Sequence, residues 1–369
     1  MKNILLFLIF LIPFSFNSYA TIEIDITEGN REPLPIAITN FFHDGNEKIT
    51  NTDLPSKIRG VIQNDLESTG LFNSIDEKAF IQENKSLHLK PRFADWRLIN
   101  SQGLVTGDLK IEDDRLKVEF RLWDTLAEKE IEGLVLITTP DNWRRISHMI
   151  ADKIYERLTG EEGYFDTRIV YVAEEGPKNN RVKKLAIMDQ DGANHKFLTS
   201  GKELVLTPRF NPVRQEITYL SYFKNLPRVY LLNIQTGIQE VVGDFPGMTF
   251  APRFSPDGNK IIMSLAREGN SDIYVMNLNS RVVERLTDSP AIDTSPSYSP
   301  DGKKITFNSD RGGSQQIYVM DSNGRNQKRI SKGSGNYATP VWSPRGDLIA
   351  FTKNFQGQYF IGVMRTDGT

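Results

Sequence analysis

The chain has 369 residues, of which 38 % are hydrophobic and 25 % charged, and its formal net charge is −2. This composition is that of a globular protein of about two domains, and it gives no electrostatic case for binding nucleic acid or an anionic membrane surface. The absence of cysteine excludes disulfides, thiol catalysis, cysteine-ligated zinc and lipidation of an N-terminal cysteine.

Residues 1–20 have the pattern of a secretory signal peptide. Lys2 supplies the positive charge, residues 4–16 form an apolar run, and Ser18 and Ala20 are the small residues of a cleavage site. The apolar run is shorter than the roughly 20 residues that a membrane-spanning helix needs. We therefore expect cleavage after Ala20, export of the chain and no insertion of the mature protein into the membrane.

Residues 21–160 are predicted to form an α/β domain. Alternation of hydrophobic and polar residues indicates strands at 22–26, 36–38, 104–111, 116–123 and 130–138. Two segments carry hydrophobic stripes at helical spacing: residues 52–69, with Asp53 as the cap, and the residues between Asp141 and Gly160. Asp113 and Asp114 are expected at a solvated hairpin tip.

Residues 168–369 contain a repeat of 44 residues, marked by Pro208, Pro252, Pro296 and Pro340. Two residues after each Pro is an aromatic residue, and three copies continue as Phe254-Ser-Pro-Asp-Gly258, Tyr298-Ser-Pro-Asp-Gly302 and Trp342-Ser-Pro-Arg-Gly346. A second pattern keeps the same step and ends at Asp189, Asn233, Asn277, Asp321 and Arg365. Such a fixed period with short strands and turn signals predicts a β-propeller.

One repeat, residues 294–337, contains four predicted strands: 294–299, the strand with Ile305 and Phe307, 316–321 and 327–331. The turns between them carry Pro and Gly where turn geometry requires a fixed or a positive φ. A single blade cannot cover both of its faces, so neighbouring blades must stack on it. An open sandwich would give no reason for a strict step of 44 residues.

The stretch Leu158-Thr-Gly-Glu-Glu-Gly-Tyr-Phe165 and its continuation to Val172 resemble the domain junction of the TolB family, the periplasmic component of the Tol-Pal system. The order of parts matches as well: a signal peptide (1–20), an α/β domain (21–160), a junction (161–167) and propeller repeats (168–369). The junction is specific to the family, whereas Ser-Pro-Asp-Gly turns occur in many unrelated propellers.

The resemblance implies a six-bladed propeller, but only about five repeats are present. The first repeat has no Pro–aromatic–Pro strand of its own, and the fifth is unfinished at Thr369. We therefore expect a C-terminally truncated chain, with unpaired strand edges at both ends of an open propeller.

No residues indicate catalysis, and no metal or cofactor is expected. Of the histidines only His195 lies in the propeller, and no nucleophile elbow or phosphate-binding loop is present. Asp189-Gln-Asp-Gly192 is similar to the start of a calcium loop but lacks the glutamate at loop position 12, which favours a β-turn. Asp257, Asp301 and Arg345 are predicted to be turn residues.

The segments that precede the repeated prolines are predicted to surround one mouth of the propeller channel. Apolar and aromatic residues there suit a protein interface, although they could equally plug the channel. The candidate mouth residues are Met248, Phe250, Ala251, Thr294, Ser295, Tyr337 and Ala338.

The resemblance implies that the mouth binds Pal, the peptidoglycan-associated lipoprotein, through the positions matching Met248, Ala251 and Thr294. It also implies that an N-terminal strand binds the inner-membrane protein TolA and alternates between a free and a docked state. The matching residues are Thr21, Ile22, Glu23, Ile24, Asp25, Ile26 and Thr27. An ordinary edge strand would show the same alternation.

The function implied is that of a non-enzymatic periplasmic adaptor. It would link Pal to the inner-membrane Tol complex, for outer-membrane integrity and for envelope constriction in cell division. Two alternatives remain at this point: a secreted propeller enzyme acting on a saccharide or peptide, and a non-functional truncated fragment.

Overall fold

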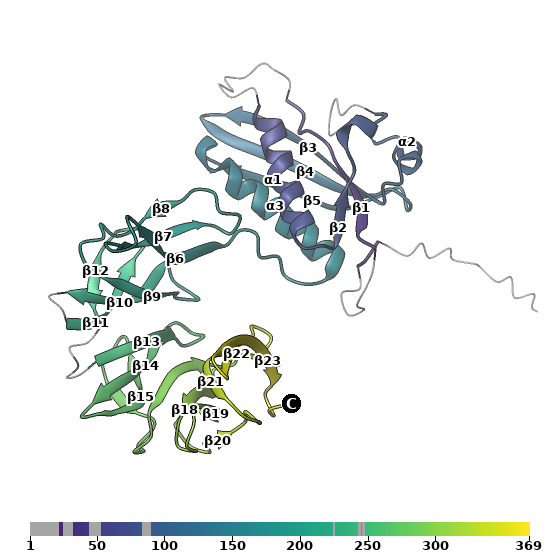
Figure 1. Cartoon of the computed structure of the whole chain (residues 1–369). Helices are drawn as coiled ribbons and strands as arrows, with labels where there is room; N and C mark the ends of the chain where they lie inside the picture. Colours follow the sequence, from purple (N-terminus) through teal and green to yellow (C-terminus); the bar gives the residue numbers. More distant parts are fainter. Residues whose placement is uncertain are drawn as a thin grey trace, which may run out of the picture. The chain divides into compact units, whose positions relative to one another are not determined.

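The computed structural model describes residues 22–24, 32–43, 53–82, 90–223, 226–242, 245 and 248–369. The chain divides into two compact units, Met1–Thr167 and Arg168–Thr369 (Figure 1), and each is described by itself. The predicted signal peptide lies outside the described residues.

The first unit is a five-stranded sheet with helices packed on it (Figure 1). The strands are β1 (Leu34–Ile38), β2 (Phe72–Ser74), β3 (Gly103–Glu112), β4 (Arg115–Asp124) and β5 (Lys129–Thr138). The helices are α1 (Leu54–Ser68), α2 (Phe93–Leu98) and α3 (Trp143–Thr159). In the order β2-β1-β3-β4-β5, β1 runs parallel to β2 and β3, and the other pairs are antiparallel. The predicted α/β fold is confirmed.

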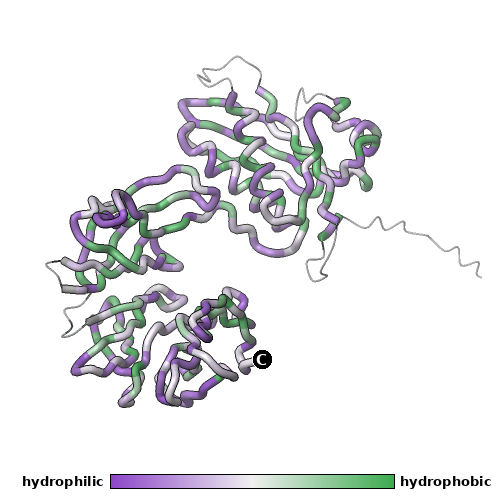
Figure 2. The backbone as a smooth tube through the Cα atoms, viewed as in Figure 1, coloured by the Kyte–Doolittle hydropathy of each residue, from purple (hydrophilic) through white to green (hydrophobic). Residues whose placement is uncertain are grey.

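The two long helices bury their hydrophobic stripes with one face of the sheet. Hydrophobic and hydrophilic residues alternate along the strands (Figure 2), and β4 alternates between buried and half-buried positions over most of its length. The shared core includes Ile58, Ile62, Ile150, Ile154, Val118 and Phe120, all 0 % exposed. Burying an isoleucine stabilises a fold by roughly 1.5–3 kcal/mol, so this core fixes both helices on the sheet.

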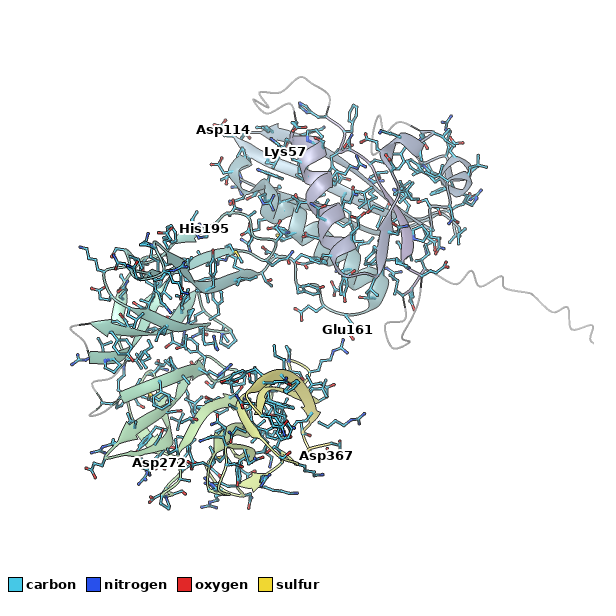
Figure 3. All side chains as sticks on the ribbon, in the orientation of Figure 1. Lys57, Asp114, Glu161, His195, Asp272 and Asp367 are labelled. Carbon is cyan, nitrogen blue, oxygen red and sulfur yellow. The ribbon has the colours of Figure 1, made fainter. Side chains whose placement is uncertain are left out.

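The end of α3 and the tip of the β3–β4 hairpin are as predicted, but the start of α3 is not. Gly160 takes φ 73° after α3, as a left-handed C-terminal cap requires. The predicted cap Asp141 is wrong: it lies in a short 3-10 turn, and Asn142 occupies the N-cap position. Asp113 and Asp114 have φ 48° and 59° and form the two-residue turn between β3 and β4, as predicted for the hairpin tip. Figure 3 labels Asp114 at this tip.

Two features of this unit were not predicted. Helix α2 covers part of the sheet, where Phe93 and Trp96 pack with Ala37 and Leu104 in a second core cluster. A buried polar pair also joins the two long helices, because Nδ1 of His148 on α3 lies 2.6 Å from Oδ2 of Asp65 on α1.

The second unit contains five successive antiparallel sheets, the blades of the propeller. Blade 1 has β6 (Arg168–Glu175), β7 (Val182–Asp189) and β8 (Lys196–Phe197). Blade 2 has β9 (Val205–Phe210), β10 (Glu216–Phe223), β11 (Leu226–Asn233) and β12 (Gln239–Val241). Blade 3 has β13 (Met248–Phe254), β14 (Lys260–Arg267), β15 (Asn270–Asn277) and β16 (Val283–Arg285).

Blade 4 has β17 (Asp293–Tyr298), β18 (Lys304–Ser309), β19 (Gln316–Asp321) and β20 (Lys328–Arg329). Blade 5 has β21 (Asn336–Trp342), β22 (Leu348–Phe355) and β23 (Gln358–Arg365). The four strands predicted for residues 294–337 are the four strands of blade 4, and five blades of a β-propeller are present, as predicted.

Each blade buries its face against the next one, and the last blade does not. Val229, Ile273 and Ile317 occupy the same repeat position on the third strands of blades 2, 3 and 4. Their side chains are buried, with exposed fractions of 1 %, 0 % and 0 %. The corresponding residue of blade 5, Ile361, is 90 % exposed. Its neighbours Tyr359 and Val363 on β23 are 76 % and 64 % exposed. The outward face of blade 5 therefore presents the same kind of surface that the other blades cover.

Candidate partner-binding site

The strands that carry the repeated prolines share an irregularity. In β9, β13, β17 and β21 the residue before the Pro has a positive φ: 48° at Thr207, 52° at Ala251, 55° at Ser295 and 50° at Thr339. The pairing with the neighbouring strand shifts register at each of these places. An extra residue in one strand bends it and turns a side chain out of the ladder. Non-glycine residues adopt this conformation at a cost, so four copies at one repeat position indicate a shared purpose.

These four residues line one cavity. It has a volume of about 400 Å³ and is bounded by the Pro-bearing strands together with β22 and β23. Thr207, Ala251, Ser295 and Thr339 all contribute to its wall. The repeat therefore brings residues that are far apart in sequence to one central cavity.

The structure brings two of the predicted mouth residues, Ala251 and Ser295, into this wall. Ser295 donates its backbone N–H to Oγ of Ser264 at 3.1 Å. Thr294 is half-buried, and its Oγ1 accepts a hydrogen bond from Nδ2 of Asn308 at 2.7 Å. Phe250 is half-buried in β13, so these residues are partly accessible beside the cavity.

The remaining mouth residues lie differently. Tyr337 is only 5 % exposed, and its hydroxyl donates to the carbonyl oxygen of Lys332 at 2.7 Å. Its ring packs against Phe351, with 5.3 Å between the ring centroids, so it belongs to the interior of blade 5. Ala338 is half-buried in β21, and Met248 begins β13.

The turn residues have the structural role predicted for them. Oδ1 of Asp301 accepts the hydroxyl of Ser299 at 2.6 Å and the backbone N–H of Lys303 at 3.1 Å. The hydroxyl bond is the main reason why the pKa of the Asp301 carboxyl is lower than its usual value. In the copy where Arg345 replaces the aspartate, Ser343 donates to Asp347 instead, at 2.7 Å. The same turn is thus closed by a carboxylate two residues further on.

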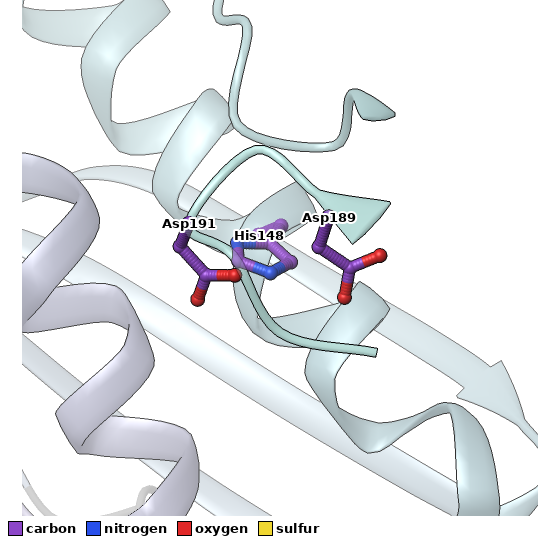
Figure 4. Close-up of side chains that lie close together, drawn as sticks. All are labelled: His148, Asp189 and Asp191. Atoms are coloured by element: carbon purple, nitrogen blue, oxygen red, sulfur yellow. The ribbon is translucent and has the colours of Figure 1, made fainter. Parts of the chain in front are cut away.

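The turn predicted at Asp189-Gln-Asp-Gly192 is also confirmed. The backbone N–H of Gly192 donates to the carbonyl of Asp189 at 3.0 Å, and Oδ1 of Asp191 accepts from the N–H of Ala193 at 3.1 Å. Figure 4 draws both aspartates with His148. Because His148 belongs to the other unit and the two units are not placed relative to one another, the three side chains are not combined into one site.

The described part of the N-terminal segment, residues 22–24, is docked on the first unit. Ile22 donates its N–H to Oδ2 of Asp124 at 3.1 Å, and Ile24 donates to the carbonyl of Leu158 at 2.6 Å. Both side chains pack against the core of that unit. The strand expected here is not formed at 22–24, because these N–H groups bond to a side chain and to a helix end. Thr21, Asp25, Ile26 and Thr27 lie outside the described residues.

Sequence reasoning missed two arginines in the cavity wall. Arg209 and Arg253 each follow the repeated Pro, and both line the cavity. The signal was present in the sequence, since the two positions are 44 residues apart and so must face the same region of the propeller.

Among the described residues, no helix is long and apolar enough to cross a membrane.

Comparisons with known proteins agree with this architecture. The family model for the TolB amino-terminal domain matches residues 22–131, and the model for the TolB beta propeller domain matches residues 155–369. The crystal structure of TolB from Acinetobacter baumannii superposes with a TM-score of 0.77 and 30 % identity, over 93 % of this chain and 83 % of that chain.

Two curated relatives are similar over a long stretch. The Tol-Pal system protein TolB of Pelagibacter ubique (strain HTCC1062) is 65 % identical over 252 residues, which are 67 % of this chain and 56 % of that protein. The protein of that name from Paramagnetospirillum magneticum (strain ATCC 700264 / AMB-1) is 58 % identical over 234 residues, 63 % of this chain and 51 % of that protein. The matched region spans about half the length of these relatives. With both domain models matched in order, and the propeller model over more than half of its residues, this chain belongs to the TolB family.

Proposed function

We propose that the chain is a non-enzymatic periplasmic adaptor of the Tol-Pal system. It binds Pal at the propeller mouth and TolA through its N-terminal segment, and so connects the outer membrane with the inner-membrane Tol complex. Outer-membrane integrity and envelope constriction in cell division depend on that connection. Membership of the TolB family supports this proposal.

The observation that carries the Pal assignment is the cavity with its four left-handed residues. Ala251 and Ser295 lie in its wall, and Thr294 lies next to Ser295 in β17. Strained backbone that recurs around one cavity is typical of a functional surface. Small side chains at these positions leave room for a partner to enter the mouth.

The docked N-terminal segment supports the TolA assignment. Residues 22–24 are held on the first unit by the N–H groups of Ile22 and Ile24, which donate to the Asp124 carboxylate and to the Leu158 carbonyl, and by the side chains of the same two residues. A short segment held by so few contacts can leave its own domain and add a strand to a partner. Free and docked states would then compete, which couples TolA binding to the rest of the protein.

Binding of purified Pal to the chain from Thr21 to Thr369, measured by calorimetry, tests the proposal. Lysine at Ala251 or at Thr294 should weaken Pal binding about tenfold or more, because a long charged side chain would fill the mouth. The matched control is Thr236→Lys, on the exposed turn after β11. Thermal midpoints of all three variants should stay close to that of the parent.

Two results would contradict the proposal in different ways. If the lysine variants bind Pal as tightly as the parent, the mouth assignment is wrong. If the folded parent does not bind Pal and holds a stoichiometric metal ion, the alternative of a propeller enzyme gains support.

A further inference from the structure

Two positive charges lie in the cavity wall at equivalent positions of neighbouring blades. Arg209 is on β9 and Arg253 on β13, each directly after the repeated Pro. The same position holds Ser297 in blade 4 and Val341 in blade 5. The positive charge is thus concentrated on the side of the cavity formed by blades 2 and 3.

Neither arginine has an acidic partner in the described structure. None of the residues that line the cavity is acidic. Nη1 of Arg209 donates to the carbonyl oxygen of Pro208 at 2.8 Å, which leaves the other donors of its guanidinium group available. Within the described ranges, the side chain of Arg253 makes no hydrogen bond or ion pair, and only its backbone is paired, with Ile262 of β14.

The environment of the two guanidinium groups disfavours their charged form. Loss of water around the guanidinium groups lowers the pKa of Arg209 and lowers that of Arg253 to about 10, where the neighbouring charge of Arg209 adds to the effect. Both groups still carry a full charge at neutral pH. Arg209 is exposed and Arg253 is half-buried, so solvent partly screens the repulsion between the two like charges, and nothing in the cavity wall compensates it.

Two other arginines of this unit have acidic partners. Arg285 is 2.6 Å from Oδ2 of Asp272, and Arg311 is 2.8 Å from Oδ2 of Asp293. Asp272 and Asp293 are themselves buried. These two arginines thus have buried acidic partners, whereas the lining of the cavity supplies none.

We propose that Arg209 and Arg253 form an anion site, which takes the carboxylate of an acidic side chain from the protein that docks at the mouth. A guanidinium group presents two parallel N–H donors that match the two oxygens of a carboxylate. Ala251 and Ser295 line the same cavity, so a side chain inserted there can reach the arginines. This inference rests on the proposed function for its protein ligand, whereas the anion site itself does not.

The first experiment compares three forms of the chain from Thr21 to Thr369 in Pal binding. They are the parent, the double variant Arg209→Gln/Arg253→Gln, and the control Arg325→Gln/Lys328→Gln. The control removes the same charge from exposed positions at and beside the outer strand β20. The Kd of the cavity variant should rise about 10- to 100-fold, and its affinity should depend less on salt than that of the parent. The control should bind as the parent does.

The free proteins provide the second readout. The thermal midpoint of the cavity variant should equal or exceed that of the parent, because two opposing charges have been removed; a structural role would lower it. At constant ionic strength, replacing chloride with malonate should raise the thermal midpoint of the parent and of the control by more than that of the cavity variant, because only the first two bind it at the site.

The outcomes separate the two proposals. Equal Pal affinity of parent and cavity variant would overturn the acidic side chain as ligand. If the parent does not bind Pal, the proposed function fails. The malonate result then decides whether the pair is a site for a free carboxylate, and an equal malonate response in all three proteins overturns the anion site.

Discussion

Replacing Ile317 or Ile361 with alanine tests the repeat architecture with one change at two equivalent positions. The two residues are 44 apart and occupy the same place in their strands, since Ile317 pairs with Asn308 and Ile361 with Thr352. Their surroundings differ completely, because Ile317 is 0 % exposed and Ile361 is 90 % exposed. The same loss of side-chain volume should therefore have two very different effects.

The expected magnitudes follow from these exposures. Isoleucine to alanine removes three carbon atoms, worth about 2.4 kcal/mol at ~0.8 kcal/mol for each buried group, and the cavity left behind brings the cost to about 2–5 kcal/mol. At the exposed position the cost should stay below about 0.5 kcal/mol. For a unit of this size, Ile317→Ala should lower the thermal midpoint of unfolding by roughly 5–15 °C, and Ile361→Ala should lower it by ~2 °C at most.

Thermal unfolding of the chain from Thr21, followed by tryptophan fluorescence and circular dichroism, measures both variants. The two units can unfold in separate steps, so the midpoint of the propeller transition is the quantity to compare. Similar losses in the two variants would refute the reasoning, since the face of blade 5 would then be as well covered as that of blade 4.

Two further predictions concern the turns and the N-terminus. Ser299→Ala should raise the pKa of Asp301 toward its usual value, as seen in an NMR titration. The variant should also be less stable than the parent by an amount that depends on pH. Because the folded-state pKa of Asp301 in the parent is depressed, this loss should be fully present above the usual carboxyl pKa and should disappear as the pH falls through the folded-state pKa. A loss of stability that does not vary with pH would contradict this. A chain that begins at residue 28 should lose TolA binding in a pull-down and keep Pal binding, whereas loss of both would show that the segment supports the fold itself.

The fold could be predicted in detail wherever hydrophobic residues or turn motifs recur at a regular spacing in the sequence. The 44-residue step located every blade, and hydrophobic stripes located α1 and α3 to within two residues at each end. The signals were strong because each element buries one face on a repeating pattern. Helix α2 was missed because its six residues are too few to show a helical period.

The candidate site could be predicted only in part. The step of 44 residues identified Ala251 and Ser295 as residues at a common region, and they line the cavity. The burial of Tyr337 could not be foreseen, because it depends on a hydrogen bond to Lys332 and on the ring of Phe351. The positive φ of Thr207, Ser295 and Thr339 could not be predicted from residue propensity, since threonine and serine favour extended backbone.

The irregular position before each repeated proline also affects how the family can change its partners. Thr207, Ala251, Ser295 and Thr339 pair with no residue of the neighbouring strand, so an exchange of their side chains disturbs no directly opposite cross-strand pair. The blades behind them keep their own cores. The wall of the cavity can therefore change at these four positions while the blade cores stay as they are, provided that each new residue tolerates the positive φ.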